Sequence, residues 1–129
     1  MIYHIFISHA WHRSEHYKKV VDWFDKSSLT YLNYSIPEED PLHSGNKTQL
    51  KKDLTNQIKP ASCIIVLGGM YAAYSEWIEY EIKEASRMGK YIIGVRPWGS
   101  ERMPQIIQDH ADDIVGWNSL SVINAVRNA

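Results

Sequence analysis

The chain has 129 residues, enough for one compact domain with little room for a second. Apolar residues make up 44% of it, which suffices for one continuous core, and the formal net charge is −1 with Lys and Arg scattered along the chain. Proteins that bind the phosphate backbone of nucleic acids normally carry a basic excess, so this balance argues against a nucleic-acid partner. We therefore expect a single domain over residues 1–129 that does not bind nucleic acid.

The cysteine content and the amino terminus predict the compartment. A single cysteine, Cys63, excludes an internal disulfide framework and suits a reducing cytoplasm. It stands within an apolar run, which indicates buried packing rather than a reactive thiol. The sequence opens directly on a strand-like segment, with no basic leader and no long apolar run. We expect a cytoplasmic protein with no membrane partner.

Short apolar runs recur along the chain and predict five strands. In chain order they cover residues 2–8, 33–36, 63–67, 91–95 and 113–117. The runs at 63–67 and 91–95 are apolar throughout, as is typical of parallel strands covered on both faces. Pro37 is expected to stop the second strand because proline cannot continue the hydrogen-bond ladder.

Apolar stripes at helical spacing fill the intervals and predict five helices. The first helix is indicated by Tyr17, Val20, Val21 and Phe24, and the second by Leu50, Leu54 and Ile58, with Pro60 at its end. The third covers residues 76–88 and is closed by Gly89, and the last two cover residues 104–110 and 119–126. This alternation predicts an α/β fold, a flavodoxin-like doubly wound parallel sheet of about five strands. Ligands of such sheets bind beyond the carboxyl ends of the strands, where the winding reverses. The segments expected there are 8–13, 37–45 and 68–75.

One carboxylate of the third predicted helix falls on the apolar side of that helix. At about 100° per residue, Glu81 projects into the middle of the apolar stripe, between Trp77 and Ala85. A carboxylate directed at a core must find a partner, shift its pKa or face a cavity. Two interpretations stay open on this pattern alone: a structural glutamate that reaches the rim of the stripe or pairs with a buried arginine or amide, or a functional carboxylate.

Two motifs resemble those of a known family. The opening IFISH over residues 5–9 is similar to the first strand of TIR domains, and SEWIEYEI over residues 75–82 resembles their Ser-x-Trp-Cys-x-x-Glu-Leu motif. The opening and the short length are similar to the bacterial TIR-like proteins of the Thoeris antiphage system. Two positions depart from the pattern: Ile78 replaces the motif's cysteine, and Ala10-Trp11 stand where many members carry basic residues.

The resemblance implies an activity. In enzymatic TIR domains the motif's glutamate is catalytic, which corresponds to Glu81 here, and the reaction cleaves NAD at the nicotinamide–ribose bond. NAD is then the substrate and no cofactor is required. The resemblance further implies self-association through TIR contacts and a cyclic ADP-ribose-type product that signals to a separate effector protein. Cleavage develops an oxocarbenium-like ribose, which one facing carboxylate can stabilise.

The remaining candidate residues surround the predicted strand ends. The expected NAD-binding residues are Ser8, His9, Ala10, Trp11, Asp40, Tyr71, Ser75 and Trp77. Backbone amides after the first strand can meet phosphate, and Trp11 can stack on a base. Structural alternatives apply to several: Trp77 as a core aromatic, Trp11 as an ordinary rim aromatic, and Asp40 as part of a solvated acidic turn.

Other chemistries find little support in the sequence. His9, His12 and His16 lack further ligands at a convincing spacing, so no metal site is predicted. Neither a GxGxxG fingerprint nor a P-loop occurs. A phosphorylated receiver domain is rejected because the third strand ends without an aspartate. A non-catalytic TIR adaptor that acts by protein assembly is the main alternative, and a nucleoside-processing transferase of related fold is a second.

Overall fold

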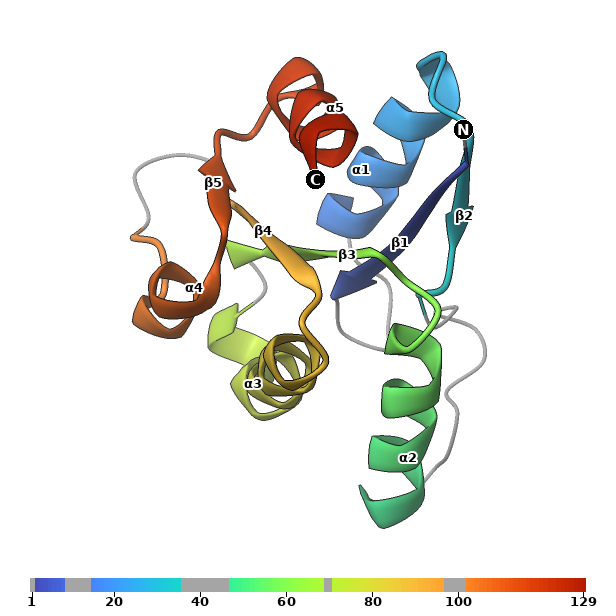
Figure 1. The fold of residues 1–129 in the computed structure, drawn as a ribbon. Helices are drawn as coiled ribbons and strands as arrows, with labels where there is room; N and C mark the ends of the chain where they lie inside the picture. Colours follow the sequence, from blue (N-terminus) through green and yellow to red (C-terminus); the bar gives the residue numbers. More distant parts are fainter. Residues whose placement is uncertain (1, 9–14, 36–46, 69–70, 97–101) are drawn as a thin grey trace.

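A computed structural model describes residues 2–8, 15–35, 47–68, 71–96 and 102–129. Five strands form one parallel sheet in the order β2-β1-β3-β4-β5 (Figure 1). Their bounds are β1 Tyr3–Ser8, β2 Tyr31–Asn33, β3 Cys63–Leu67, β4 Tyr91–Val95 and β5 Asp113–Val115. The predicted doubly wound α/β fold is confirmed.

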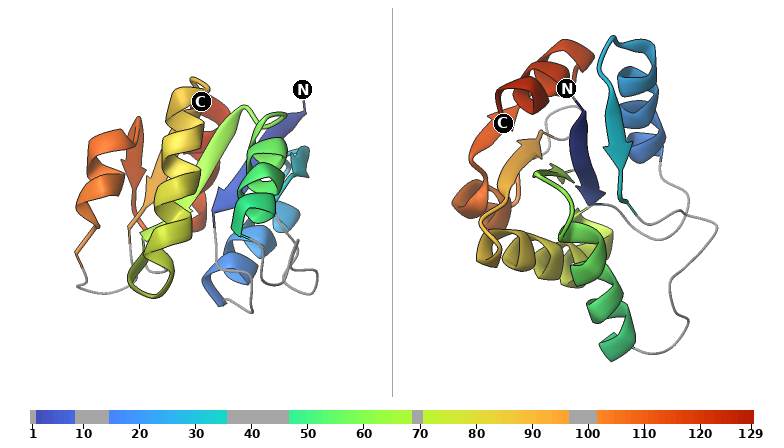
Figure 2. Two further views of the ribbon diagram at one scale, coloured as in Figure 1. Left: turned by 90° about the horizontal axis from the view of Figure 1, so that it is seen from below. Right: turned by 45° about the vertical axis from the view of Figure 1, so that its right-hand side comes forward.

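Helices cover both faces of this sheet. Helices α1 (Glu15–Lys26) and α5 (Ser119–Asn128) lie on one face, and α2 (Lys47–Ile58), α3 (Tyr71–Arg87) and α4 (Gln105–His110) lie on the other (Figures 1 and 2). In the left view of Figure 2, α4, α3 and α2 stand in a row across the sheet. This double cover explains why β3 is buried at every position.

The second strand differs from its prediction over residues 33–36. It pairs with β1 earlier, through Tyr31, Leu32 and Asn33. The Tyr34 amide still donates to the Ile5 carbonyl at 2.8 Å, and beyond it the Ile7 amide donates to the side chain of Ser35, at Oγ, at 2.7 Å. Ile36 lies outside the described residues. The observed strand therefore starts two residues before the predicted one, and its pairing with β1 passes to a serine hydroxyl two residues before Pro37.

Smaller differences concern the ends of other elements. Helix α3 begins at Tyr71 rather than at residue 76, and β5 ends at Val115 rather than at residue 117. The strands at 63–67 and 91–95 agree with their predictions. Helix α5 begins after Asn118, whose side chain accepts a hydrogen bond from the Ser121 amide at 2.8 Å.

Two apolar cores lie on either side of the sheet. Successive side chains of a strand point to opposite faces. Ile5 and Ile7 of β1 therefore pack against α1 and α5, and Phe6 packs against α2 and α3. Gly94 of β4 permits close packing of the second core, since a Cβ there would lie 2.7 Å from Ile107 Cγ2.

The single cysteine and the lengths of the helices bear on two expectations from the sequence. Cys63 is buried, and this burial raises the pKa of its thiol to about 12, which makes it an unreactive core side chain. Within the described ranges, none of the helices has the length and apolar character that a membrane span requires.

Candidate functional site

The sheet reverses its winding between β1 and β3. From β1 the chain passes through α1 to the outer strand β2, and later strands add in the other direction as β3, β4 and β5. The carboxyl ends of β1 and β3 are adjacent, with Ser8 in register with Val66. In open α/β sheets this is where ligands bind.

Two of the predicted site residues meet at this point. Ser8 ends β1 and, two positions after Phe6, faces the same side of the sheet as α3. Glu81 lies on α3 among Ile78, Ile82 and Ala85, which are all buried in that core. The strand alternation and the helix period thus direct a hydroxyl and a carboxylate into one apolar layer.

Glu81 is buried at a position that does not favour its charge. Its side chain is 1% exposed, and Ser8 beside it is 0% exposed. Burial raises the pKa of the Glu81 carboxyl well above its usual range, because the apolar surroundings penalise the ionised form. The neighbouring Ser8 hydroxyl acts in the opposite direction and lowers the pKa in part.

The two buried groups are not fully satisfied. Neither Ser8 Oγ nor Glu81 Oε1 has a hydrogen-bond partner of ordinary geometry among the described residues. The influence of Ser8 on the Glu81 pKa therefore reflects proximity rather than a well-formed bond. Buried polar atoms without partners are costly, and each calls for a reason such as a ligand or a reaction.

The structural alternative for Glu81 was an ion pair with a buried arginine. No salt bridge to Glu81 is formed within the part of the chain that the structure describes. The arginine of the same helix, Arg87, binds a different carboxylate, Glu84, with Nε 2.8 Å from Oε2. The packing thus leaves Glu81 without a countercharge from these residues.

The other predicted binding residues are placed less completely. Trp77 is half-buried and packs against the core on the α3 side, one turn before Glu81. Tyr71 and Ser75 belong to the first turns of α3, but their side chains lie outside the description. His9, Ala10, Trp11 and Asp40 lie outside the described residues, so their roles stay predictions.

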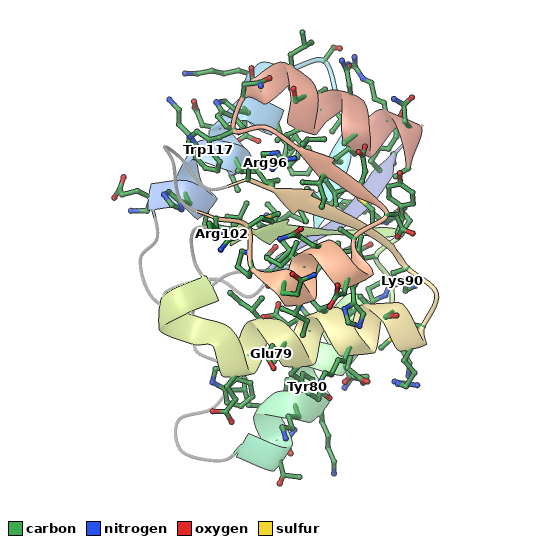
Figure 3. The ribbon with its side chains drawn as sticks, turned by 90° about the vertical axis from the view of Figure 1, so that its left-hand side faces the viewer. Glu79, Tyr80, Lys90, Arg96, Arg102 and Trp117 are labelled. Carbon is green, nitrogen blue, oxygen red and sulfur yellow. The ribbon has the colours of Figure 1, made fainter. Side chains whose placement is uncertain are left out.

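The carboxyl edge of the sheet carries side chains that the sequence analysis did not single out. Arg96 directly follows β4, and Trp117 follows β5 by two residues (Figure 3). The Arg96 amide donates to the Val115 carbonyl at 2.8 Å, which holds the two strand ends together. Arg102 is also exposed, and Figure 3 shows it on the same side of the molecule as Arg96 and Trp117. In the sequence, only their positions could have indicated them, because Arg96 follows the predicted strand 91–95 and Trp117 stands at the end of the predicted strand 113–117.

His16 contacts an aromatic side chain in the structure. Its ring lies 5.0 Å from the ring of Trp117, which in turn lies 4.9 Å from that of Trp23. The described residues contain no group of three or more His, Cys, Asp or Glu side chains arranged to hold a metal ion. His9 and His12, the other members of the histidine set, lie outside the description.

Comparisons with known proteins address the family and the fold. Residues 6–102 match the family described as Thoeris protein ThsB, TIR-like domain, a span that includes the carboxyl end of β1, the whole of α3 and Glu81. No curated protein matches the chain. A de novo designed Rossmann 2x3 fold protein, solved by NMR in solution, is similar with a TM-score of 0.55 and 16% identity over 99% of this chain and 88% of that one. At this identity the likeness shows the fold alone.

Proposed function

Because the chain belongs to the TIR-like family of the Thoeris protein ThsB, we propose that it is an enzyme that cleaves NAD, with Glu81 as the catalytic carboxylate. The family supports a TIR role in antiphage defence. The reaction itself, the cytoplasmic location and the product are our proposals. NAD is the substrate in this proposal, and the reaction needs no cofactor.

One observation carries the assignment of Glu81. The carboxylate is 1% exposed, its Oε1 atom lacks a partner among the described residues, and it lies beside the carboxyl end of β1 at the reversal of the sheet. A purely structural glutamate gains nothing from this position, since a hydrophobic residue would pack there without the cost of burying a polar group. A carboxylate that meets a cationic reaction centre would be stabilised by it.

The chemistry needs a single negative charge. Cleavage of the bond between nicotinamide and ribose sends the bonding electrons to the pyridinium nitrogen, and neutral nicotinamide leaves. The ribose then carries oxocarbenium-like positive charge, which the Glu81 carboxylate would stabilise in a low-dielectric layer. A nucleophile of the same molecule, a hydroxyl or a base nitrogen, then attacks the anomeric carbon and loses its proton, which gives a cyclic ADP-ribose-type product.

Cyclisation is proposed over hydrolysis for two reasons. The carboxylate lies among apolar side chains, and no second carboxylate that could activate a water is hydrogen-bonded to Glu81 or Ser8 in the described structure. Water exclusion favours capture of the cation by a group of the same molecule. The product would then act on a separate effector protein in the defence response.

The burial of Glu81 also implies regulation. At 1% exposure the side chain is closed to a substrate, so NAD reaches it only after a rearrangement of its surroundings. We propose that self-association of the domain provides this rearrangement. Specific activity of the activated protein should then rise with protein concentration. Constant specific activity across a hundredfold dilution series would contradict this dependence.

The test of the function compares Glu81→Gln with the wild type. Nicotinamide release should fall at least about a hundredfold in the variant, because an amide cannot supply the charge that stabilises the ribosyl cation. Glu76→Gln is the matched control, since Glu76 is an exposed glutamate of the same helix and should keep wild-type activity. Mass spectrometry and chromatography of the same mixtures identify the product.

The outcomes separate the alternatives. Wild-type turnover in Glu81→Gln would refute the catalytic role, and an inert wild type that still assembles would favour a TIR adaptor. Linear ADP-ribose as the dominant first product would show a plain NAD glycohydrolase. Turnover of other nucleosides or nucleotides, with NAD left intact, would favour the transferase.

A further inference from the structure

A hollow lies on the opposite face of the sheet from Glu81. It measures about 380 Å³ and is lined by Glu15, His16, Lys19 and Trp117. Glu15, His16 and Lys19 come from the first turns of α1, and Trp117 comes from the segment after β5. We propose that this hollow binds a nucleoside phosphate, the adenylate half of NAD, with its base against Trp117.

The aromatic wall of the hollow is held in place by neighbouring rings. Trp117 is half-buried and packs between His16 and Trp23, with ring centroids 5.0 and 4.9 Å away. These contacts fix the indole while leaving part of it toward the hollow. A fixed, partly exposed aromatic is a stacking platform for a nucleobase, and such stacking is worth about 1–3 kcal/mol per base in known complexes.

The polar groups of the hollow match the other parts of a nucleotide. Lys19 is exposed and Glu15 is exposed, and neither forms an ion pair with another described residue. An ammonium group binds phosphate, and a carboxylate accepts hydrogen bonds from ribose hydroxyls. A site for a free phosphate alone would not place Glu15 beside it, whereas a nucleotide uses both charges.

The position of Arg96 connects the two faces. It stands at the carboxyl end of β4, its side chain is exposed, and it forms no ion pair in the described part of the chain. Trp117 follows β5, three strand spacings from β1 in the sheet order, or about 14 Å. That figure is the lateral separation of the two strands, and a dinucleotide that joins Glu81 to Trp117 must also cross the carboxyl edge of the sheet from one face to the other. Arg96 lies at that edge, next to β5, and would meet its phosphates.

Another hollow of the molecule does not fit a ligand as well. The cavity of about 300 Å³ near the amino end of β4 includes Lys90, His110 and Asp112. Their polar atoms already bind the protein: Lys90 Nζ donates to Lys59 O, and Asp112 accepts from the Ile92 amide, both at 2.8 Å. His110 Nδ1 lies 2.9 Å from the Ile106 carbonyl. These groups serve the fold, whereas Glu15 and Lys19 form no ion pair with another residue that the structure describes.

The test uses AMP, adenosine and ribose 5-phosphate as probes in direct binding measurements on the full chain. AMP should bind the wild type, and Trp117→Ala should weaken it about tenfold, while Trp117→Phe should retain most of the affinity. Lys19→Ala should weaken AMP and ribose 5-phosphate but leave adenosine unchanged. Lys26→Ala is the matched control, because Lys26 is 76% exposed on the same helix and pairs with Asp22.

This inference rests on the proposed function only where it names NAD, since AMP binding needs no cleavage. Loss of AMP affinity in both Trp117→Ala and Lys19→Ala supports the site even if the protein never turns over NAD. Because Lys19 is exposed, its variant remains informative if Trp117→Ala fails to fold. Absence of AMP binding at millimolar concentration, or equal affinity in wild type and Lys19→Ala, overturns the proposal even if NAD is cleaved.

Discussion

Two carboxylates of α3, three residues apart, experience opposite surroundings. Glu81 lies in the core against β1, where burial raises its pKa well above the usual range. Glu84 lies at the contact of α2 and α3, where hydrogen bonds from Arg87 lower its pKa to about 2, with smaller help from Thr55 and Tyr80. Thr55 Oγ1 lies 2.8 Å from Glu84 Oε1 and Arg87 Nη2 lies 2.9 Å from the same atom.

The two sites differ in the hydrogen-bond donors and the countercharge that surround each glutamate. At Glu84 the fold supplies donors from two helices and one countercharge, as a structural carboxylate requires. At Glu81 the described residues offer the Ser8 hydroxyl, and neither Ser8 Oγ nor Glu81 Oε1 has a hydrogen-bond partner among them. The same short stretch of chain therefore satisfies one carboxylate and leaves the other unsatisfied, which is the pattern expected when the second serves a function.

The largest effect should appear in the pH dependence of NAD turnover. Only ionised Glu81 stabilises the ribosyl cation, so kcat/KM should rise about tenfold per pH unit below the raised pKa of Glu81. Ser8 lowers that pKa, so Ser8→Ala should move the midpoint of the profile to higher pH. Initial rates of nicotinamide release across pH, in wild type and variant, measure both midpoints.

Ser86→Ala controls for the loss of a serine, because Ser86 is exposed on the same helix. It should leave the profile unchanged. A flat wild-type profile between pH 5 and 8, or identical midpoints in wild type and Ser8→Ala, would contradict a role of Ser8 in setting the charge of Glu81 and would remove the distinction between the two carboxylates.

The contrast also indicates what the sequence could predict. Helix periodicity alone placed Glu81 on the apolar side of α3, and strand runs predicted β3 and β4 because both are buried on two faces. Such features depend on neighbours along the chain, which the sequence displays directly. The resemblance to TIR domains then added the role of the carboxylate, which periodicity did not contain.

Other features depend on groups distant in the sequence and were not predictable. The bond from Ile7 to Ser35 that ends β2 joins residues 28 positions apart, and the packing of Trp117 on His16 joins the two ends of the chain. The donors around Glu84 come from α2 as well as α3, so its low pKa has no local signature. Only the fold brings these partners together.

A second prediction concerns the stability of Glu81→Gln. The pKa of Glu81 is higher in the folded protein than in the unfolded chain, where it is about 4.5. The wild type therefore loses stability as the pH rises from about 4.5 through the pKa of Glu81 in the folded protein. The neutral amide lacks this loss, so the variant should equal the wild type near pH 4 and be more stable at pH 8, by about 1–2 kcal/mol. Urea unfolding at the two pH values measures the difference.

Gly94→Ala provides a comparison without a charge in the same core. Its new Cβ would lie 2.7 Å from Ile107 Cγ2 and 2.8 Å from Met103 Cε, so overpacking should lower stability by about 1–3 kcal/mol at both pH values. If Glu81→Gln likewise shows one pH-independent difference from the wild type, burial of charge is not the cause, and the interpretation of Glu81 as an unsatisfied carboxylate fails.

The smallest effect is expected at Glu84. The pKa of Glu84 is about 2 in the folded protein and about 4.5 in the unfolded chain. Its ionised form therefore contributes stability above pH 4.5, and this contribution is lost as the pH falls toward about 2. Glu84→Gln should therefore destabilise the protein at pH 7 by only about 1 kcal/mol, because Arg87 is exposed and its attraction is screened by solvent. The difference should shrink below pH 4, opposite in sign and in pH range to that of Glu81→Gln. Urea unfolding of both variants between pH 3 and 8 tests the pair directly, and NAD turnover of Glu84→Gln should stay at the wild-type level. A loss of turnover in this variant, with its stability unchanged, would show that the satisfied carboxylate also serves the reaction, and the division between the two would no longer hold.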